Sequence, residues 1–124
     1  MSTVSSHGGV IAVINDLIFE TKIRSTAASF GVSTFVVRSV SDLPAEMERV
    51  RPALLLIDLN TTADQAVDAV TIAHEHPSKP YVVAFLSHVD QELAERARLA
   101  GADEIMPRSR FNHMLPELLK TRAN

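Results

Sequence analysis

The sequence predicts an α/β fold, namely a doubly wound, five-stranded parallel sheet in the order 2-1-3-4-5 with helices on both faces. Strand-like runs alternate strictly with helical patterns, which is typical of a parallel sheet with right-handed crossovers. The strongest runs are continuously apolar, as in strands buried on both faces. The 124 residues, 46% of them hydrophobic, suffice for one three-layer domain with a substantial core.

Each predicted strand is a short apolar or β-branched run bounded by polar or turn residues. The third is the most apolar segment of the chain, and the fifth is the shortest. The five predicted strands are residues 10–14, 33–37, 53–57, 81–86 and 105–106.

Between these runs, apolar residues recur at helical spacing. Helix boundaries are indicated by cap residues: Asn15 or Asp16, and later Asp90, are N-cap candidates, and Gly31 and Gly101 are C-terminal signals. The predicted helices are 17–30, 43–50 with Pro44 in its first turn, 63–73 capped by Thr61 or Thr62, 91–100, and 111–119, in which Pro116 predicts a kink or a late start.

Composition excludes several classes of protein. The net charge is −3 without a basic stripe, which argues against a nucleic-acid partner. The absence of cysteine excludes disulfides, thiol nucleophiles and zinc–cysteine sites. Apolar runs are too short to span a membrane, and residues 1–9 resemble a disordered tail rather than a signal peptide. We therefore expect one cytoplasmic domain over residues 10–124.

In an open parallel sheet, ligand chemistry collects beyond the carboxyl ends of the strands. The polar residues at those ends are Asn15, Asp16, Asp58, Asn60, Ser87, His88 and Arg108. Asp58 follows five apolar residues, so its carboxylate is placed to act as a nucleophile in phosphoryl transfer if Mg²⁺ offsets the charge. The alternative is an ordinary strand-end aspartate that caps a loop or the next helix.

Two segments, 54–60 (Leu-Leu-Leu-Ile-Asp-Leu-Asn) and 100–109 (Ala-Gly-Ala-Asp-Glu-Ile-Met-Pro-Arg-Ser), resemble motifs of the CheY-like receiver domains of response regulators. The resemblance extends over residues 10–119 and implies a flavodoxin-like fold. It also implies that Asp58 is the phosphoacceptor and that the Asn60 carbonyl is a ligand of Mg²⁺.

The chain departs from the receiver pattern at several positions. Asn15 replaces the second acid of the acidic pair, which leaves Asp16 and predicts a weak Mg²⁺ site of Asp16, Asp58 and Asn60. Arg108 replaces the lysine that the family has there, and the two are not equivalent. We expect Arg108 to contact Asp58 directly, in the strongest form through a bidentate pair.

Two further positions of the pattern also differ. Leu86 or Ser87 fills the Thr/Ser position, and chemistry favours Ser87, which we expect to act with Asp58 and Arg108. Ile105 replaces the family's aromatic switch residue. We expect this to weaken coupling between the ends of the fourth and fifth strands.

The resemblance implies a stand-alone signalling module of a two-component or phosphorelay pathway, with the degenerate site of a pseudo-receiver. We expect no enzymatic activity, a monomer or weak homodimer, and a protein partner that is a histidine kinase or a downstream effector. The alternative is a small flavodoxin-like enzyme or ligand-binding domain that uses the same crevice. The basic residues around the last strand and helix indicate either ordinary solubility or docking of an acidic partner: Arg108, Arg110, Lys120 and Arg122.

Overall fold

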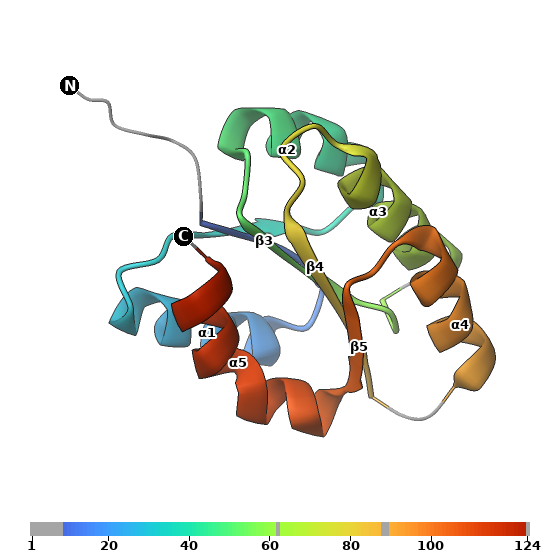
Figure 1. Ribbon diagram of the computed structural model, residues 1–124. Coiled ribbons are helices and arrows are strands. Elements are labelled where there is room, and N and C mark those ends of the chain that lie inside the picture. The colour runs from blue at the N-terminus through green and yellow to red at the C-terminus, as the bar shows by residue number, and fades with distance from the viewer. Residues whose placement is uncertain (1–8, 62, 88–89, 124) are drawn as a thin grey trace.

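The computed structural model describes residues 9–61, 63–87 and 90–123, which form one α/β unit (Figure 1). Its strands are β1 (Val10–Val13), β2 (Thr34–Val37), β3 (Leu54–Asp58), β4 (Tyr81–Leu86) and β5 (Glu104–Pro107). Its α-helices are α1 (Leu17–Ser29), α2 (Leu43–Val50), α3 (Ala63–Glu75), α4 (Gln91–Ala100) and α5 (Arg108–Arg122), and a 3₁₀ turn, η1 (Val40–Asp42), precedes α2.

The sheet has the predicted strand order, β2-β1-β3-β4-β5, and each neighbouring pair is parallel. The predicted α/β class and order are therefore confirmed. The helices also follow the sequence pattern, except at the C-terminal end. There, α5 begins at Arg108 and continues through Pro116, so the late start is wrong. The helix tolerates Pro116 although a proline cannot donate the backbone hydrogen bond of that position.

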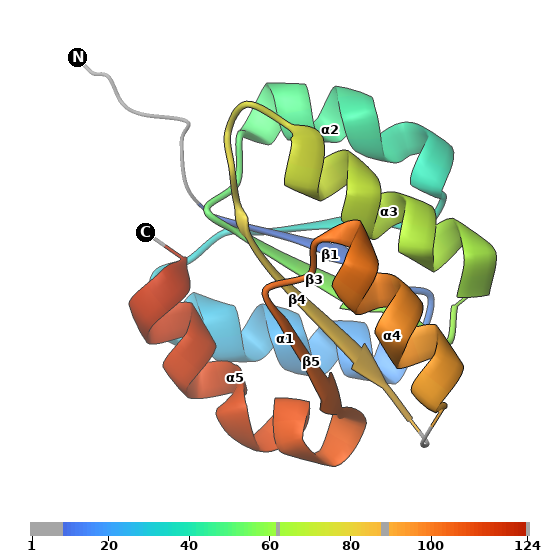
Figure 2. The same cartoon turned by 45° about the vertical axis from the view of Figure 1, so that its right-hand side comes forward.

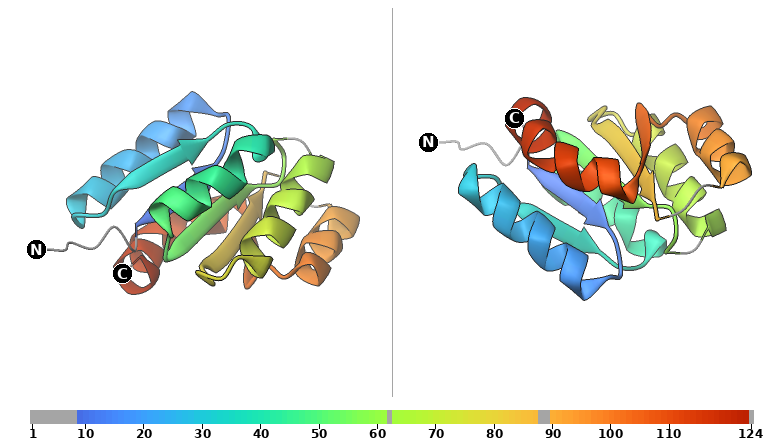
Figure 3. Two further views of the ribbon diagram at one scale, coloured as in Figure 1. Left: turned by 90° about the horizontal axis from the view of Figure 1, so that it is seen from above. Right: turned by 90° about the horizontal axis from the view of Figure 1, so that it is seen from below.

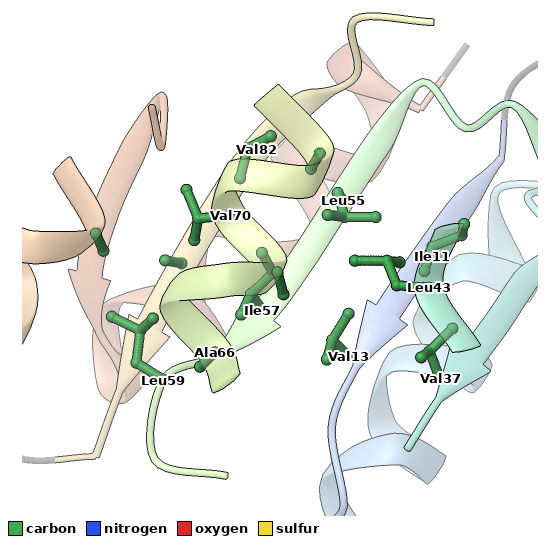
Figure 4. Packing of buried hydrophobic residues seen from close by; sticks show 14 of the residues in the cluster. Ile11, Val13, Val37, Leu43, Leu55, Ile57, Leu59, Ala66, Val70 and Val82 are labelled. Atoms are coloured by element: carbon green, nitrogen blue, oxygen red, sulfur yellow. The ribbon is translucent and has the colours of Figure 1, made fainter. Parts of the chain in front are cut away.

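Helices lie on both faces of the sheet (Figure 3), and a cluster of buried apolar side chains joins the sheet to the helices on each face. On one face, Leu43 of α2 and Val70 of α3 pack against side chains of β1, β3 and β4 (Figure 4), and Leu93 of α4 belongs to the same cluster. On the other face, α1 and α5 cover the sheet, and Phe85 stacks on Phe111 with ring centroids 4.1 Å apart. Because β3 is buried on both faces, it is apolar at every position until Asp58.

Helix ends follow the predicted caps. Asp16 accepts a hydrogen bond from the Phe19 amide at 3.0 Å, and Asp90 accepts one from Leu93 at 3.0 Å. Gly101 closes α4 at φ +116°, where a Cβ atom would lie only 2.4 Å from the His74 ring. This residue therefore has both conformational and steric reasons to be glycine.

Residues 1–8 of the predicted tail 1–9 lie outside the residues that the structure describes. Gly9 is described, and its amide donates to the Ala123 carbonyl at 3.1 Å, which ties the start of β1 to the end of α5. Among the helices formed by the described residues, none is both long and apolar enough to cross a membrane.

Candidate functional site

The candidate site lies where the carboxyl ends of β1, β3, β4 and β5 meet. Parallel pairing sets this arrangement, since Asp58 is in register with Phe85 and Phe85 with Met106. The residues just beyond those strands therefore converge at one edge. Four of the predicted site residues join Asp58 there, namely Asp16, Asn60, Ser87 and Arg108. Asn15 is exposed, and His88 lies outside the described residues.

Asp58 is a buried carboxylate, with 5% of the residue exposed. Its Oδ1 accepts a hydrogen bond from the backbone N–H of Asn60 at 2.9 Å, and its Oδ2 accepts one from Arg108 Nη2 at 3.2 Å. Its backbone carbonyl accepts from the Thr61 amide. Each carboxylate oxygen therefore already has a protein donor.

Arg108 bridges the two acids of the site. Its Nη2 contacts Asp58, and its Nη1 lies 3.5 Å from Asp16 Oδ2. Its guanidinium carbon lies 4.5 Å from the centroid of the Phe19 ring, a cation–π geometry. The predicted direct Asp58–Arg108 contact is confirmed, but its bidentate form is wrong, because the two nitrogens of the fork reach different carboxylates.

Burial and hydrogen bonding perturb the two acids in opposite directions. Burial raises the pKa of Asp58, although the Asn60 amide and the Arg108 charge oppose that rise. The pKa of Asp16 is lowered, first by the hydrogen bond from the Phe19 amide and further by Arg108. Asp16 therefore acts as a helix cap and as a second counterion of Arg108, while Asp58 is the acid that burial disfavours in its charged form.

Asn60 connects β3 to β4 through its side chain. Its Oδ1 accepts hydrogen bonds from the Ser87 amide and, at 2.9 Å, from the Ser87 hydroxyl. Leu86, the other candidate for the Thr/Ser position, is buried in the core beneath α3 and α4. Ser87 is thus the one of the two that contacts the site.

Sequence reasoning missed two contributors, the Asn60 side chain and the Phe19 ring. The receiver resemblance implies a role only for the backbone carbonyl of Asn60, and no neighbouring residue in the sequence indicates a side-chain bond to Ser87. Phe19 falls within the predicted helix 17–30, and the sequence pattern gives it no separate role. Phe19 lies three residues after the cap residue Asp16, in the first turn of a helix that starts at the site edge, and this position is the signal that could identify it.

The residues at this edge do not fit a Mg²⁺ ion in the arrangement described. Mg²⁺ needs carboxylate oxygens in near-octahedral geometry. Here the Arg108 guanidinium contacts both carboxylates, and the backbone N–H of Asn60 donates a hydrogen bond to Asp58 Oδ1. Among the described residues, no group of three or more acidic, histidine or cysteine side chains could hold a metal. The Arg108 guanidinium therefore contacts the two carboxylates that a metal ion at this edge would need as ligands.

A groove of about 320 Å³ lies beside the site between α4 and β5. Leu86, Ser87, Ile105 and Met106 contribute to its walls, whereas Asp58 and Arg108 do not line it. Ile105 is half-buried and packs against the core on the α2–α4 side. This groove therefore does not present the buried acid or the arginine to a ligand.

Neither protein-family models nor curated proteins give a match to the sequence. Solved structures do match. A response regulator from Thermotoga maritima has 15% identity and a TM-score of 0.78 over 94% of this chain and 98% of its own. HP1043, an orphan response regulator of H. pylori, has 18% identity and a TM-score of 0.77, with 94% and 97% covered.

A third match is a response regulator protein from Burkholderia pseudomallei, solved with a phosphorylated aspartic acid, a calcium ion and citrate. It has 12% identity and a TM-score of 0.77, with 94% of this chain and 68% of that chain covered. These similarities extend over nearly the whole described sheet and its helices. The chain therefore has the CheY-like, flavodoxin-type fold of the receiver domains of response regulators.

Proposed function

We propose that this chain is a receiver-like signalling module that acts through protein–protein contacts, and that its resting state is held by an internal cation instead of by phosphate and Mg²⁺. The observation that carries the proposal is the bridge from Arg108 to Asp58 and Asp16. Asp58 remains the candidate phosphoacceptor, but the site around it is degenerate. The module is not proposed to be an enzyme.

Aspartyl phosphorylation requires a carboxylate oxygen that attacks phosphorus and a cation that neutralises the incoming phosphoryl group. In the resting arrangement, the Asn60 amide and Arg108 engage the two oxygens of Asp58. A metal would have to displace Arg108 from both acids. We therefore expect phosphorylation to be slow, and any Mg²⁺ binding to be weak.

The same bridge favours one conformation without phosphate. Arg108 begins α5 directly after β5, so its contact with Asp58 joins the ends of β3 and β5. Asn60 and Ser87 join the ends of β3 and β4. A partner, either a histidine kinase or a downstream effector, would recognise this fixed edge. We expect the module itself to be a monomer or a weak homodimer in the cytoplasm.

Intact-mass analysis after incubation with a small phosphodonor and Mg²⁺ tests the proposal. The wild-type chain should gain little or no phosphoryl mass. The Asn15→Asp/Arg108→Lys variant, which restores the receiver pattern, should gain one phosphoryl group, and adding Asp58→Asn to it should abolish that gain. Stoichiometric phosphorylation of the wild type at Asp58 would overturn the proposal.

A further inference from the structure

A polar pocket lies at the end of the sheet opposite Asp58, where no predicted site residue is found. Its volume is about 580 Å³, which is within the range of small-molecule sites. Its walls come from the starts of β4 and β5, the α3–β4 connection and the end of α5, elements that lie together at that end in Figure 2. His74, Ser78, Lys79, Tyr81, Asp103 and Arg122 are among the residues that line it.

Arg122 is the main reason to assign a ligand to this pocket. Its guanidinium carbon lies 4.0 Å from the centroid of the Tyr81 ring, and the Tyr81 hydroxyl is itself fixed by a 2.7 Å hydrogen bond to Glu104. Within residues 9–61, 63–87 and 90–123, Arg122 makes no hydrogen bond or ion pair. A guanidinium that is held flat by stacking and has unused donors matches the paired oxygens of a carboxylate or phosphate.

Lys79 brings a second positive charge to the same pocket. Its backbone has φ +51°, a left-handed conformation in which glycine would be less strained. Its Nζ donates to the His74 carbonyl at 3.2 Å, and no carboxylate of the described part of the chain pairs with it. The lysine thus occupies a position where backbone conformation alone would favour a different residue.

The charges that oppose an anion here are weaker or already engaged. Asp103 lines the pocket, and its Oδ2 accepts a hydrogen bond from the Val82 amide at 2.8 Å. The C-terminal ends of α3 and α5 carry partial negative charge, and the Lys79–His74 bond offsets part of it. Arg122 and Lys79 therefore bring two positive charges to the pocket, where the Asp103 carboxylate is held by the Val82 amide and the Glu104 carboxylate by the Tyr81 hydroxyl.

We infer that this pocket binds a small organic anion that carries a carboxylate or phosphate group, with Arg122 and Lys79 as the groups that hold it. The pocket lies at the opposite end of the sheet from Asp58, so this inference does not depend on the proposed signalling function. It also gives a specific role to Arg122, which belongs to the basic group around the last helix.

Amide and arginine-side-chain NMR titrations of the full chain at constant ionic strength test this inference. The probes are glycerol 3-phosphate, malate and inorganic phosphate, with glycerol as the neutral control. An organic anion should cause saturable shifts at Val82, Asp103 and the Arg122 Nε–H, and glycerol should not. Arg122→Gln should weaken binding at least tenfold. Arg110→Gln, which removes the same charge from the same helix outside the pocket, should leave binding unchanged.

Lys79→Gly separates ligand binding from folding. It relieves the left-handed strain, so the melting temperature should rise while affinity for the organic anion falls. Non-saturable shifts, or equal weakening by the Arg122 and Arg110 substitutions, would overturn the inference. Inorganic phosphate binding as tightly as both organic probes would overturn the assignment of an organic ligand.

Discussion

Removing Arg108 should destabilise the fold mainly through the charge that it leaves on Asp58. At the observed 3.2 Å, the Coulomb attraction is about 5 kcal/mol with an effective dielectric constant of about 20. The Arg108 side chain is 31% exposed and is shared with Asp16, so solvent and the second acid reduce that attraction. We expect Arg108→Gln to lower the free energy of unfolding at pH 7 by about 2 kcal/mol, less than the 3–5 kcal/mol typical of fully buried pairs.

A double-mutant cycle isolates this contribution from the packing of Arg108 on Phe19. In the Asp58→Asn background, Arg108→Gln leaves no buried carboxylate without a counterion. It should therefore cost at least 1 kcal/mol less than in the wild type, measured by urea denaturation. Arg110→Gln is the matched control, because this exposed arginine also lies in the first turn of α5. An equal loss in both Asp58 backgrounds would refute the charge argument and leave only packing.

The remaining predictions concern pH, a glycine and the link between β3 and β4. The pKa of Asp58 is raised in the folded chain, so the folded state binds a proton at this carboxyl more tightly than the unfolded state does. The free energy of unfolding that Asp58 contributes therefore falls as the pH rises from below the ordinary aspartate pKa through the raised value. Asp58→Asn should therefore be more stable than the wild type at pH 7, and this advantage in urea denaturation should disappear at pH values below the ordinary pKa. Gly101→Ala should lower the free energy of unfolding by more than about 1 kcal/mol, because its φ of +116° and the nearby His74 ring both oppose a Cβ atom, and an unchanged urea midpoint would contradict this. Asn60→Ala should leave stability within about 1 kcal/mol of the wild type but increase hydrogen exchange at the Ser87 amide, because this amide loses its bond to Asn60 Oδ1. Unchanged exchange would show that this bond does not protect the amide.

Much of the fold could be predicted because its signals are local and repeated. A strand buried on both faces, such as β3, must be apolar throughout, and Asp16, Asp90 and Gly101 mark helix ends by their own chemistry. The late start predicted for the last helix is wrong because burial of Leu115 and Leu118 outweighs the backbone hydrogen bond that Pro116 cannot donate. Local preference therefore failed where packing of the whole helix decided the outcome.

The site was only partly predictable, because its geometry depends on side-chain choices between distant segments. The Asp58–Arg108 contact followed from strand order, since both residues lie at the same edge of the sheet. The division of the guanidinium between Asp58 and Asp16 could not follow, because Asp16 is positioned by its cap bond to Phe19. The Asn60–Ser87 bond likewise depends on which rotamer the Asn60 side chain adopts beside β4.

Paramagnetic line broadening by Mn²⁺ tests most directly whether Arg108 takes the place of a metal. In the wild-type chain, low concentrations of Mn²⁺ should leave the amide signals of Asn60 and Asp16 as sharp as those of the opposite sheet edge. In Arg108→Gln, which removes the guanidinium from both carboxylates, the same concentrations should broaden the two signals selectively. Selective broadening in the wild type at the same Mn²⁺ concentration as in Arg108→Gln would contradict the account.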